Sequence, residues 1–582
     1  MISTVLIKNI KGFSILFIGI FLFIYSPVFT GEFLSWDDKD YIINNLEVKD
    51  ISFTGVVDFF TKPYLGNYHP VTMLAYSLQF YLFGANASGF HFVSALLHLI
   101  NFLLVFWLAN FLLKKKISAI IVASLFLLHP INIESVAWIS EQKNLLYVLF
   151  LLLSLKFYFE YSESGEKKKY LFSILSFLLS ALSKGQAVSL PIIILAVEFI
   201  KLDDFKLRKS IANKIPYFII SLLFGIIAIK SQNFDGYINE SHNFNFLQKI
   251  FIYSYDFLFY FIKIIFPFDL KAYYPYLENI PFCYSLLGVL VLAVFGGAFY
   301  LNKKKKSRIY LGVLIIYTSC VGLIIQVIPL GEAMVAERYA YLPSVFICVF
   351  GVYFLGKHLS SEKAKAIIGI LFICFFSCYT FSRVKVWKND TVFFTDLLNK
   401  LPENEIVLNS SAANYMAQGK FEEAKNLLER AIAKDSNYFQ AYFNLGLTRL
   451  KLNEIENAII AFNKVESIQS DYFEATYYKG ICFQKKGDYN QSIIEFTKTL
   501  EINKNHNESL LQRAIGYGKL NQFKSALIDL EVLTSRQYKP EMTYYLIGLS
   551  KFKLNTNGCA DILTARNYGN PNADAVLAEY CK

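Results

Sequence analysis

Long apolar runs dominate the chain up to about residue 382, and short charged clusters separate them. A helical run of about 17–25 apolar residues is long enough to cross the hydrocarbon of a bilayer. The pattern predicts eleven membrane spans, at 13–29, 91–113, 117–131, 143–160, 170–183, 186–200, 214–230, 282–301, 309–328, 342–356 and 366–382. Residues 1–383 are therefore expected to form an all-α, polytopic membrane domain.

A different pattern follows, with a period of 34 residues. After a linker at 384–404, residues 405–582 divide into five units that begin at Glu405, Phe439, Phe473, Asn507 and Glu541. A small residue recurs at the eighth position of each unit: Ala412, Gly446, Gly480, Ala514 and Gly548. This pattern resembles the tetratricopeptide (TPR) repeat of paired helices. It predicts a soluble α-solenoid whose last unit is a cap, with a concave surface for an extended partner. A spacer or a dimerisation surface is the alternative.

The basic clusters predict the topology of the membrane domain. Clusters at 114–116, 167–169 and 201–209 follow the second, fourth and sixth predicted spans. Because basic residues in short loops mark the cytoplasmic side, loop 30–90 is expected to be external. The apolar run 249–266 is ambiguous, since its crossing would reverse the side of everything after it. We expect it not to cross, which leaves 231–281 and the TPR repeats external.

Composition agrees with an integral membrane protein. Hydrophobic residues make up 55% of the 582 residues and charged residues only 18%, whereas soluble domains carry about 25% charged residues. The net charge of +11 is explained by basic loops between spans, so no nucleic-acid partner is predicted. Enrichment in Lys, Ile, Asn and Phe suggests an AT-rich bacterial genome, and therefore a bacterial inner membrane.

Two adjacent carboxylates, Asp37 and Asp38, follow the first predicted span. Charges beside the membrane are costly and tend to be functional. One of them could accept a proton from an attacking hydroxyl while its neighbour orients the acceptor. The alternative is a solvated loop or a helix cap.

Further polar residues lie at the external ends of the predicted spans. They are His69, His129, Glu134, Glu141, Lys143, Lys184, Gln186, Glu337, Arg338 and Tyr339. Cations in such a cluster suit a phosphate leaving group, and arginine forms the best fork for one. There is no Walker loop, no zinc-protease motif and no nucleophile elbow. No metal-binding residues and no certain cofactor are predicted, and the sequence leaves a requirement for a divalent metal open.

Cys559 and Cys581 flank the last helical segment of the repeats. If the repeats lie outside the cytoplasm, a disulfide between them would staple the end of the solenoid. Two free thiols are the alternative.

Several motifs together resemble a known family. They are Trp36-Asp-Asp38, Tyr68-His-Pro-Val-Thr-Met73, Gly89-Phe-His-Phe92, His98-Leu-Ile-Asn101, His129-Pro-Ile-Asn-Ile-Glu-Ser-Val-Ala137 and Glu337-Arg-Tyr-Ala-Tyr-Leu-Pro343. With the terminal repeats, the chain resembles the transmembrane and TPR-containing O-mannosyltransferases and their bacterial relatives, within the GT-C class of glycosyltransferases.

The resemblance implies an inverting transfer of a sugar, with mannose as the candidate, from a polyprenyl-phosphate donor to a protein Ser or Thr hydroxyl on the external side. It implies that Asp37 and Asp38 are catalytic and that Glu337 and Arg338 lie at the lipid phosphate. His69, His129, Glu134, Lys143 and Lys184 are further candidates for substrate binding. The TPR repeats would recruit the acceptor protein.

Two other functions are considered. A non-catalytic scaffold could recruit exported or cell-envelope proteins through the repeats, but it would not need external carboxylates and cations in one cluster. A transporter or flippase would place its charges near the middle of the membrane, whereas the acidic pair is in an external loop.

Overall fold

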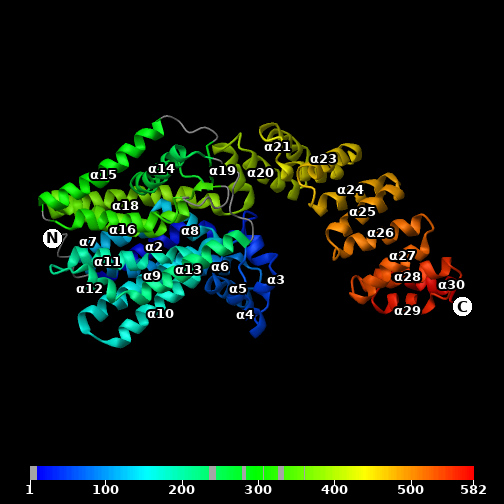
Figure 1. Cartoon of the computed structure of the whole chain (residues 1–582), viewed down its shortest axis with the longest axis horizontal. Coiled ribbons are helices and arrows are strands. Elements are labelled where there is room, and N and C mark those ends of the chain that lie inside the picture. The colour runs from blue at the N-terminus through cyan, green and yellow to red at the C-terminus, as the bar shows by residue number, and fades with distance from the viewer. Residues whose placement is uncertain are drawn as a thin grey trace. The chain divides into compact units, whose positions relative to one another are not determined.

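The computed structural model describes residues 10–234, 244–277, 283–305, 307–325, 333–359 and 361–581. The chain forms two compact units, which divide between Leu397 and Leu398. Figure 1 shows that both are built from helices.

The first unit contains seventeen of the α-helices and one short antiparallel strand pair within the described residues. Its helices are α2 (Ile10–Phe29), α3 (Leu46–Lys49), α4 (Phe53–Thr61), α5 (Pro70–Phe83), α6 (Ala87–Leu113), α7 (Lys116–Leu127), α8 (Ile133–Ala137), α9 (Gln142–Ser164), α10 (Lys167–Ser183), α11 (Leu190–Lys201), α12 (Leu207–Ala212), α13 (Ile215–Phe234), α14 (Phe246–Ile265), α15 (Cys283–Lys305), α16 (Ile309–Val321), α17 (Tyr341–His358) and α18 (Glu362–Val384). Helix α19 (Asp390–Lys400) begins in the first unit and ends in the second. The strands are β1 (Tyr274–Pro275) and β2 (Ala333–Val335), and short helical turns are η1 (Lys39–Ile43), η2 (Pro130–Asn132), η3 (Ile139–Glu141), η4 (Gly185–Ser189), η5 (Glu337–Ala340) and η6 (Lys385–Trp387). The all-helical prediction is confirmed.

The predicted count of eleven crossings is not confirmed. In the part of the chain that the structure describes, six helices are long and apolar enough to cross a membrane, or seven if Lys116–Leu127 and Pro130–Ala137 form one bent span. Every predicted span overlaps a helix. However, α10 has 17 residues and α11 only 12, so length alone does not support a separate crossing for each. Residues 235–243, 278–282 and 326–328 of the predicted segments lie outside the described residues.

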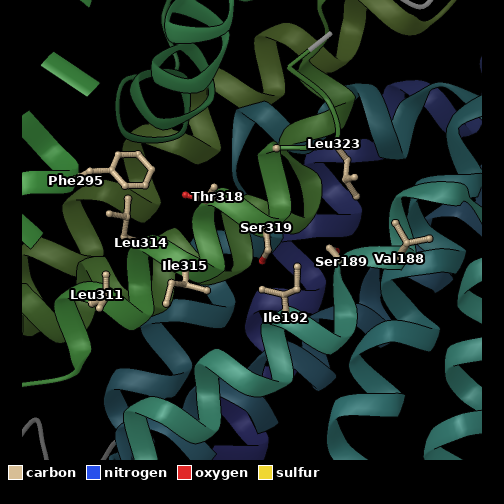
Figure 2. Close-up of a pocket in the computed structure, with 11 residues that line it drawn as sticks. Val188, Ser189, Ile192, Phe295, Leu311, Leu314, Ile315, Thr318, Ser319 and Leu323 are labelled. Atoms are coloured by element: carbon tan, nitrogen blue, oxygen red, sulfur yellow. The ribbon is translucent and has the colours of Figure 1, made fainter. Parts of the chain in front are cut away.

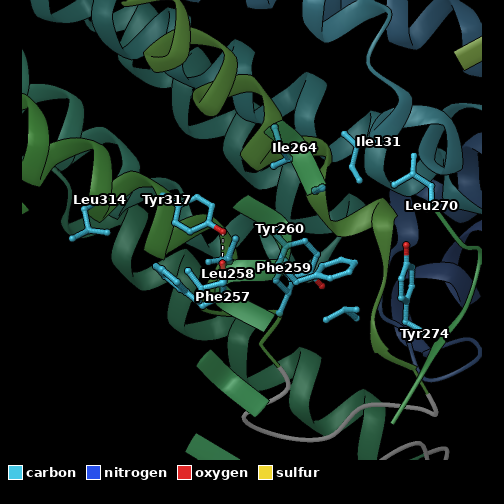
Figure 3. Packing of buried hydrophobic residues seen from close by; sticks show 14 residues of the cluster. Ile131, Phe257, Leu258, Phe259, Tyr260, Ile264, Leu270, Tyr274, Leu314 and Tyr317 are labelled. Atoms are coloured by element: carbon cyan, nitrogen blue, oxygen red, sulfur yellow. Dashed lines mark hydrogen bonds between the residues drawn. The ribbon is translucent and has the colours of Figure 1, made fainter. Parts of the chain in front are cut away.

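Helix α14 covers all but the last residue of the ambiguous run 249–266, and it is not among the candidate spans of the described residues. One side of α14 packs against α16. The ring of Phe257 lies edge-on to that of Tyr317, with centroids 4.9 Å apart, and the Tyr317 hydroxyl donates a hydrogen bond to the Phe257 carbonyl (Figure 3). The aromatic residues of this run therefore contribute to the interior of the first unit.

The segment 384–404, expected to link the two domains, is largely helical. Trp387 of η6 stacks on Trp138, with ring centroids 5.8 Å apart. Phe393 of α19 packs against Trp36, and Asp390 forms an ion pair with Lys39 at 2.9 Å. The contacts of Phe393 and Asp390 attach the start of α19 to the loop that contains the acidic pair.

The second unit is a series of helix pairs (Figure 1). Its helices are α20 (Glu405–Ala417), α21 (Phe421–Lys434), α22 (Phe439–Lys451), α23 (Ile455–Ile468), α24 (Phe473–Lys486), α25 (Tyr489–Ile502), α26 (Asn507–Lys519), α27 (Phe523–Ser535), α28 (Pro540–Lys553), α29 (Cys559–Asn567) and α30 (Ala573–Tyr580). The first helix of each repeat begins within one residue of the predicted start of its unit. Cys559 and Cys581 are disulfide-bonded, with Cα atoms 5.8 Å apart.

Gly446→Ala is expected to destabilise the repeats by about 1–3 kcal/mol, because an added methyl group overpacks a close helix contact. A Cβ atom at Gly446 would lie 2.5 Å from the ring of Phe462 on the paired helix. Thermal or denaturant unfolding of the full chain measures the effect. The matched control is Gly518→Ala, where a Cβ atom meets nothing within 4 Å and helix propensity favours alanine. Equal effects at the two positions would contradict this explanation of the small eighth residue.

Candidate active site

The acidic pair lies in the loop that follows α2. The Glu32 backbone N–H donates to the Lys388 carbonyl (2.9 Å), which fixes the loop against the chain before α19. The backbone N–H groups of Asp40 and Tyr41 donate hydrogen bonds to the Asp37 carbonyl and so close the next turn. This tight turn directs the two neighbouring carboxylates to different surroundings.

Asp38 points into the protein and is only 1% exposed. One carboxylate oxygen accepts hydrogen bonds from the Ser140 N–H (2.8 Å) and the Ser140 hydroxyl (2.5 Å). The other accepts from the Leu34 N–H (3.0 Å). The two Ser140 donors hold the loop against η3 and the Leu34 donor closes the loop on itself, so the Asp38 carboxylate is already used by the protein itself.

Asp37 instead lines a polar cavity of about 640 Å³. Among the described residues, its carboxylate takes part in no hydrogen bond or ion pair. The cavity walls also contain the following polar side chains: Asp40, Tyr41, Asn67, Tyr68, His69, Glu141, Lys143, Lys184, Gln186, Gln232, Arg338 and Tyr339. Asp37 is therefore the member of the pair that can reach a bound molecule.

Three cations of the cavity converge on Glu141. Its carboxylate lies 3.1 Å from Lys143 Nζ, 3.3 Å from Lys184 Nζ and 3.4 Å from Arg338 Nε. These residues come from α9, the turn before η4, and η5. Glu141 therefore holds three basic side chains together in one wall of the cavity, where an anionic ligand can contact them.

Glu134 holds the same arginine from behind. Arg338 Nη1 lies 2.6 Å from one Glu134 carboxylate oxygen, and the Arg338 N–H donates to the other at 2.9 Å. Glu134 itself is buried and does not line the cavity. Its contacts orient the guanidinium, which also lies over the Trp138 ring.

His69 lies in the cavity wall at the start of α5, and both of its ring nitrogens are buried without a hydrogen-bond partner among the described residues. Burial, together with Lys143 and Lys184, lowers the pKa of His69 to about 3. The imidazole is therefore neutral, and it offers one donor and one acceptor to a ligand.

Burial raises the pKa of both carboxyl groups of the pair. The pKa of Asp37 rises to about 6, although Lys143 and Arg338 oppose the effect. The pKa of Asp38 rises to about 7, against the hydrogen bonds from Ser140 and Leu34. A carboxylate with a pKa near 6 is a stronger base than an ordinary aspartate and is still ionised at neutral pH.

Like Asp38 and Glu134, two further sequence-predicted residues, His129 and Glu337, do not line the cavity. The ring of His129 bonds to the Ile264 carbonyl (2.7 Å) and accepts from the Ile131 N–H. The carboxylate of Glu337 accepts from the Lys271 N–H (2.5 Å) and the Tyr274 hydroxyl (2.7 Å). Both side chains join the α14 region to the rest of the unit.

Four polar residues of the cavity were not singled out from the sequence: Asp40, Tyr41, Asn67 and Gln232. Asp40 and Tyr41 come two and three residues after Asp38, and Asn67 is two residues before His69. Closeness to the predicted motifs was the only signal for these three, and Gln232, near the end of α13, had no such signal.

An apolar groove of about 340 Å³ adjoins the polar cavity, and the two share Val188, Gly322 and Leu323 in their walls. Figure 2 shows its lining, which comes mainly from Leu311, Leu314 and Ile315 of α16, with Ile192 of α11 and Phe295 of α15. The combined site offers a charged chamber and an adjoining apolar groove. In the described part of the chain, no three His, Cys, Asp or Glu side chains are grouped to hold a metal ion.

Comparison with known families bears on this site. Residues 62–230 match the family described as dolichyl-phosphate-mannose-protein mannosyltransferase, and residues 412–473 match the tetratricopeptide repeat. The first match contains His69, Glu134, Glu141, Lys143 and Lys184 of the site. The expected family resemblance is confirmed.

Individual relatives extend the match to most of the chain. A protein O-mannosyl-transferase of Caenorhabditis elegans is 22% identical over 450 residues, covering 72% of this chain. Protein O-mannosyl-transferase TMTC4 of Homo sapiens is 24% identical over 471 residues, covering 68% of this chain. Protein O-mannosyl-transferase TMTC1 of Homo sapiens is 32% identical over 155 residues, which cover 25% of this chain and 17% of the relative. The matches to the first two span 62% of each relative's own length.

Proposed function

We propose that the protein is a membrane glycosyltransferase that transfers a sugar, mannose, from a polyprenyl-phosphate donor to a Ser or Thr hydroxyl of a protein. The observation that carries this proposal is the position of the unpaired Asp37 carboxylate in one cavity with Lys143, Lys184 and Arg338. The names of the matching family and of the relatives support mannose as the sugar and a protein as the acceptor.

In the proposed reaction, Asp37 is the general base. The acceptor oxygen attacks the anomeric carbon and its proton passes to the Asp37 carboxylate. The bond between the anomeric carbon and the phosphate oxygen breaks, and the electron pair leaves with the phosphate. Attack from the face opposite the leaving group inverts the configuration at the anomeric carbon. Asp38 is a positioning residue, because its three hydrogen bonds fix the loop that carries the base.

The basic side chains of the cavity have the second role, which is to bind the donor phosphate. We assign the donor phosphate to Arg338, Lys143 and Lys184, which Glu141 already holds together. Charge that develops on the leaving phosphate is stabilised by cations whose positions are set before the reaction. The neutral ring of His69 is suited to a sugar or acceptor hydroxyl.

The apolar groove suits the lipid portion of the donor. It adjoins the charged chamber at Val188, Gly322 and Leu323, so a donor could place its phosphate on the cations and its first isoprene units between α11, α15 and α16. A polyprenyl-phosphate mannose should therefore support transfer, whereas a water-soluble nucleotide-mannose should not. Transfer from the nucleotide sugar at a similar rate would contradict the lipid-linked donor.

The pH profile tests the identity of the base. With a pKa of about 6, Asp37 loses its negative charge as the pH falls through 6, so kcat/KM should fall tenfold per pH unit below that value. Asp58→Asn, a substitution at an exposed ion pair of the same loop region, should leave the profile unchanged. A flat profile between pH 5 and pH 8, in protein that remains folded, would exclude Asp37 as the base.

We place the site and the TPR repeats on the external, periplasmic side, in a bacterial inner membrane. The disulfide between Cys559 and Cys581 supports this placement, since disulfides persist in oxidising compartments. Protein taken from its native membrane should give the two cysteines as one cross-linked peptide under non-reducing conditions. A reporter after Lys582 that works only in the cytoplasm should be silent. Two alkylated thiols together with an active reporter would place the repeats in the cytoplasm.

A further inference from the structure

Four lysines recur at one position of four successive repeats. They are Lys451, Lys485, Lys519 and Lys553, and neighbours in this set are 34 residues apart. Each lies in the last turn of the first helix of its repeat, in α22, α24, α26 and α28, and each is exposed. We refer to these four residues as the lysine ladder.

The ladder lies on the inner surface of the solenoid. The small eighth residue of a repeat faces the second helix, as Gly446 faces Phe462 and Gly480 faces Phe496. The ladder lysine comes five residues later, about 140° around the helix from that contact. The first helices of successive repeats also contact one another directly, which places them on the inner side of the stacked pairs.

An apolar row runs beside the ladder. Leu447, Ile481, Ile515 and Leu549 each precede a ladder lysine by four residues, and all four are half-buried. A spacing of four residues puts both side chains on one face of the helix. The inner surface therefore presents apolar contact area next to a line of positive charge.

The protein does not neutralise the ladder itself. Among the described residues, none of the four lysines forms an ion pair. Acidic residues in the adjoining turns are engaged elsewhere: Glu454 pairs with Lys425 at 2.9 Å, Asp561 pairs with Lys551 at 2.7 Å, and Asp488 caps α25. The positive charge is thus available to a partner.

Helix stability alone does not explain the pattern. A lysine near a helix C-terminus interacts favourably with the helix dipole, and this would apply equally to the second helices. The second helices have a recurrent basic position of their own, Arg430, Lys464 and Lys498, but Arg430 pairs with Glu403 and Lys498 with Glu495. The ladder lysines differ because none of them forms an ion pair among the described residues, and this points to a ligand on their surface.

The spacing of the ladder specifies the ligand. Packed helices lie about 8–10 Å apart, and an extended polyproline-type chain advances about 9 Å in three residues. We propose that the lysine ladder binds an extended, acidic polypeptide segment of the acceptor protein, with a carboxylate at every third residue. The link to an acceptor rests on the proposed function, but the binding itself requires no donor and no transfer.

The test uses full-length protein in discs of neutral lipid. The probe is a labelled decapeptide with Glu at positions 1, 4, 7 and 10 and Pro or Ala between them. The comparison peptide has the same composition with the four Glu residues contiguous. The spaced peptide should bind more tightly, and Lys→Gln at all four ladder positions should weaken its binding about tenfold to thirtyfold, since exposed ion pairs are weak singly but act here as a set. The matched control is Lys→Gln at four other exposed lysines, Lys420, Lys464, Lys504 and Lys524.

Three results would overturn the inference. They are equal affinity for the two peptides, unchanged affinity in the ladder variant, and ladder-dependent binding to phosphatidylglycerol vesicles without binding of the spaced peptide. The last result would assign the ladder to a membrane surface. Peptide binding in a protein that transfers no sugar would instead refute the proposed function and leave the inference standing.

Discussion

Asp37→Asn is expected to reduce sugar transfer by about 10²–10⁴-fold, the usual contribution of a general base. The amide cannot accept the proton of the attacking hydroxyl. The protein should still fold and bind donor lipid, because the Asp37 carboxylate takes part in no hydrogen bond or ion pair among the described residues. Transfer at saturating donor, together with thermal unfolding, measures both parts of this expectation.

Asp38→Asn is the matched control, and it should behave differently. In either orientation of the amide, its NH₂ group faces a backbone N–H, of Ser140 or of Leu34. A buried donor left without an acceptor costs about 1–3 kcal/mol, so the main effect should be on unfolding. If Asp38→Asn abolished transfer at unchanged stability while Asp37→Asn remained active, the roles of the two residues would be reversed.

Arg338→Ala should raise the KM for donor lipid and lower kcat, because in the proposed mechanism the guanidinium contacts the phosphate both in the bound donor and in the transition state. It should also destabilise the protein by about 3–5 kcal/mol, since the buried carboxylate of Glu134 loses the cation that neutralises it. Donor titrations and thermal unfolding separate the two effects.

The double variant Arg338→Ala with Glu134→Gln separates the role of Arg338 in donor binding from its role in neutralising the buried Glu134 carboxylate. Removing both charges should recover much of the stability but none of the donor affinity. Recovery of transfer as well as stability would mean that Arg338 acts only through its ion pair. Arg338→Lys, which keeps the charge and loses the fork, should lie between the wild type and Arg338→Ala.

The sequence predicts the repeats well because their packing is local. Each helix pair is closed by a small residue against an aromatic or aliphatic one, as at Gly446 and Phe462, and this contact repeats every 34 residues. The number of crossings is harder to predict, because several helices such as α11 are apolar but short. Their burial among neighbours depends on packing that hydropathy does not describe.

The site is predicted less completely for a related reason. Nothing local distinguishes Asp37 from Asp38. The difference is made by Ser140, whose N–H and hydroxyl reach Asp38 from a distant part of the chain. The side chains of His129 and Glu337 are likewise suited to catalysis. In the structure, however, they form hydrogen bonds with backbone groups in and just after α14.

The most direct measurement is mannose transfer by purified full-length protein from a radiolabelled polyprenyl-phosphate mannose to a Ser- or Thr-containing protein substrate, with Asp37→Asn in parallel. Our account predicts a labelled, alkali-labile product with the wild type, and a rate lower by about 10²–10⁴-fold with the variant. Equal rates for the two proteins, or no transfer by folded wild type that binds the donor lipid, would contradict it.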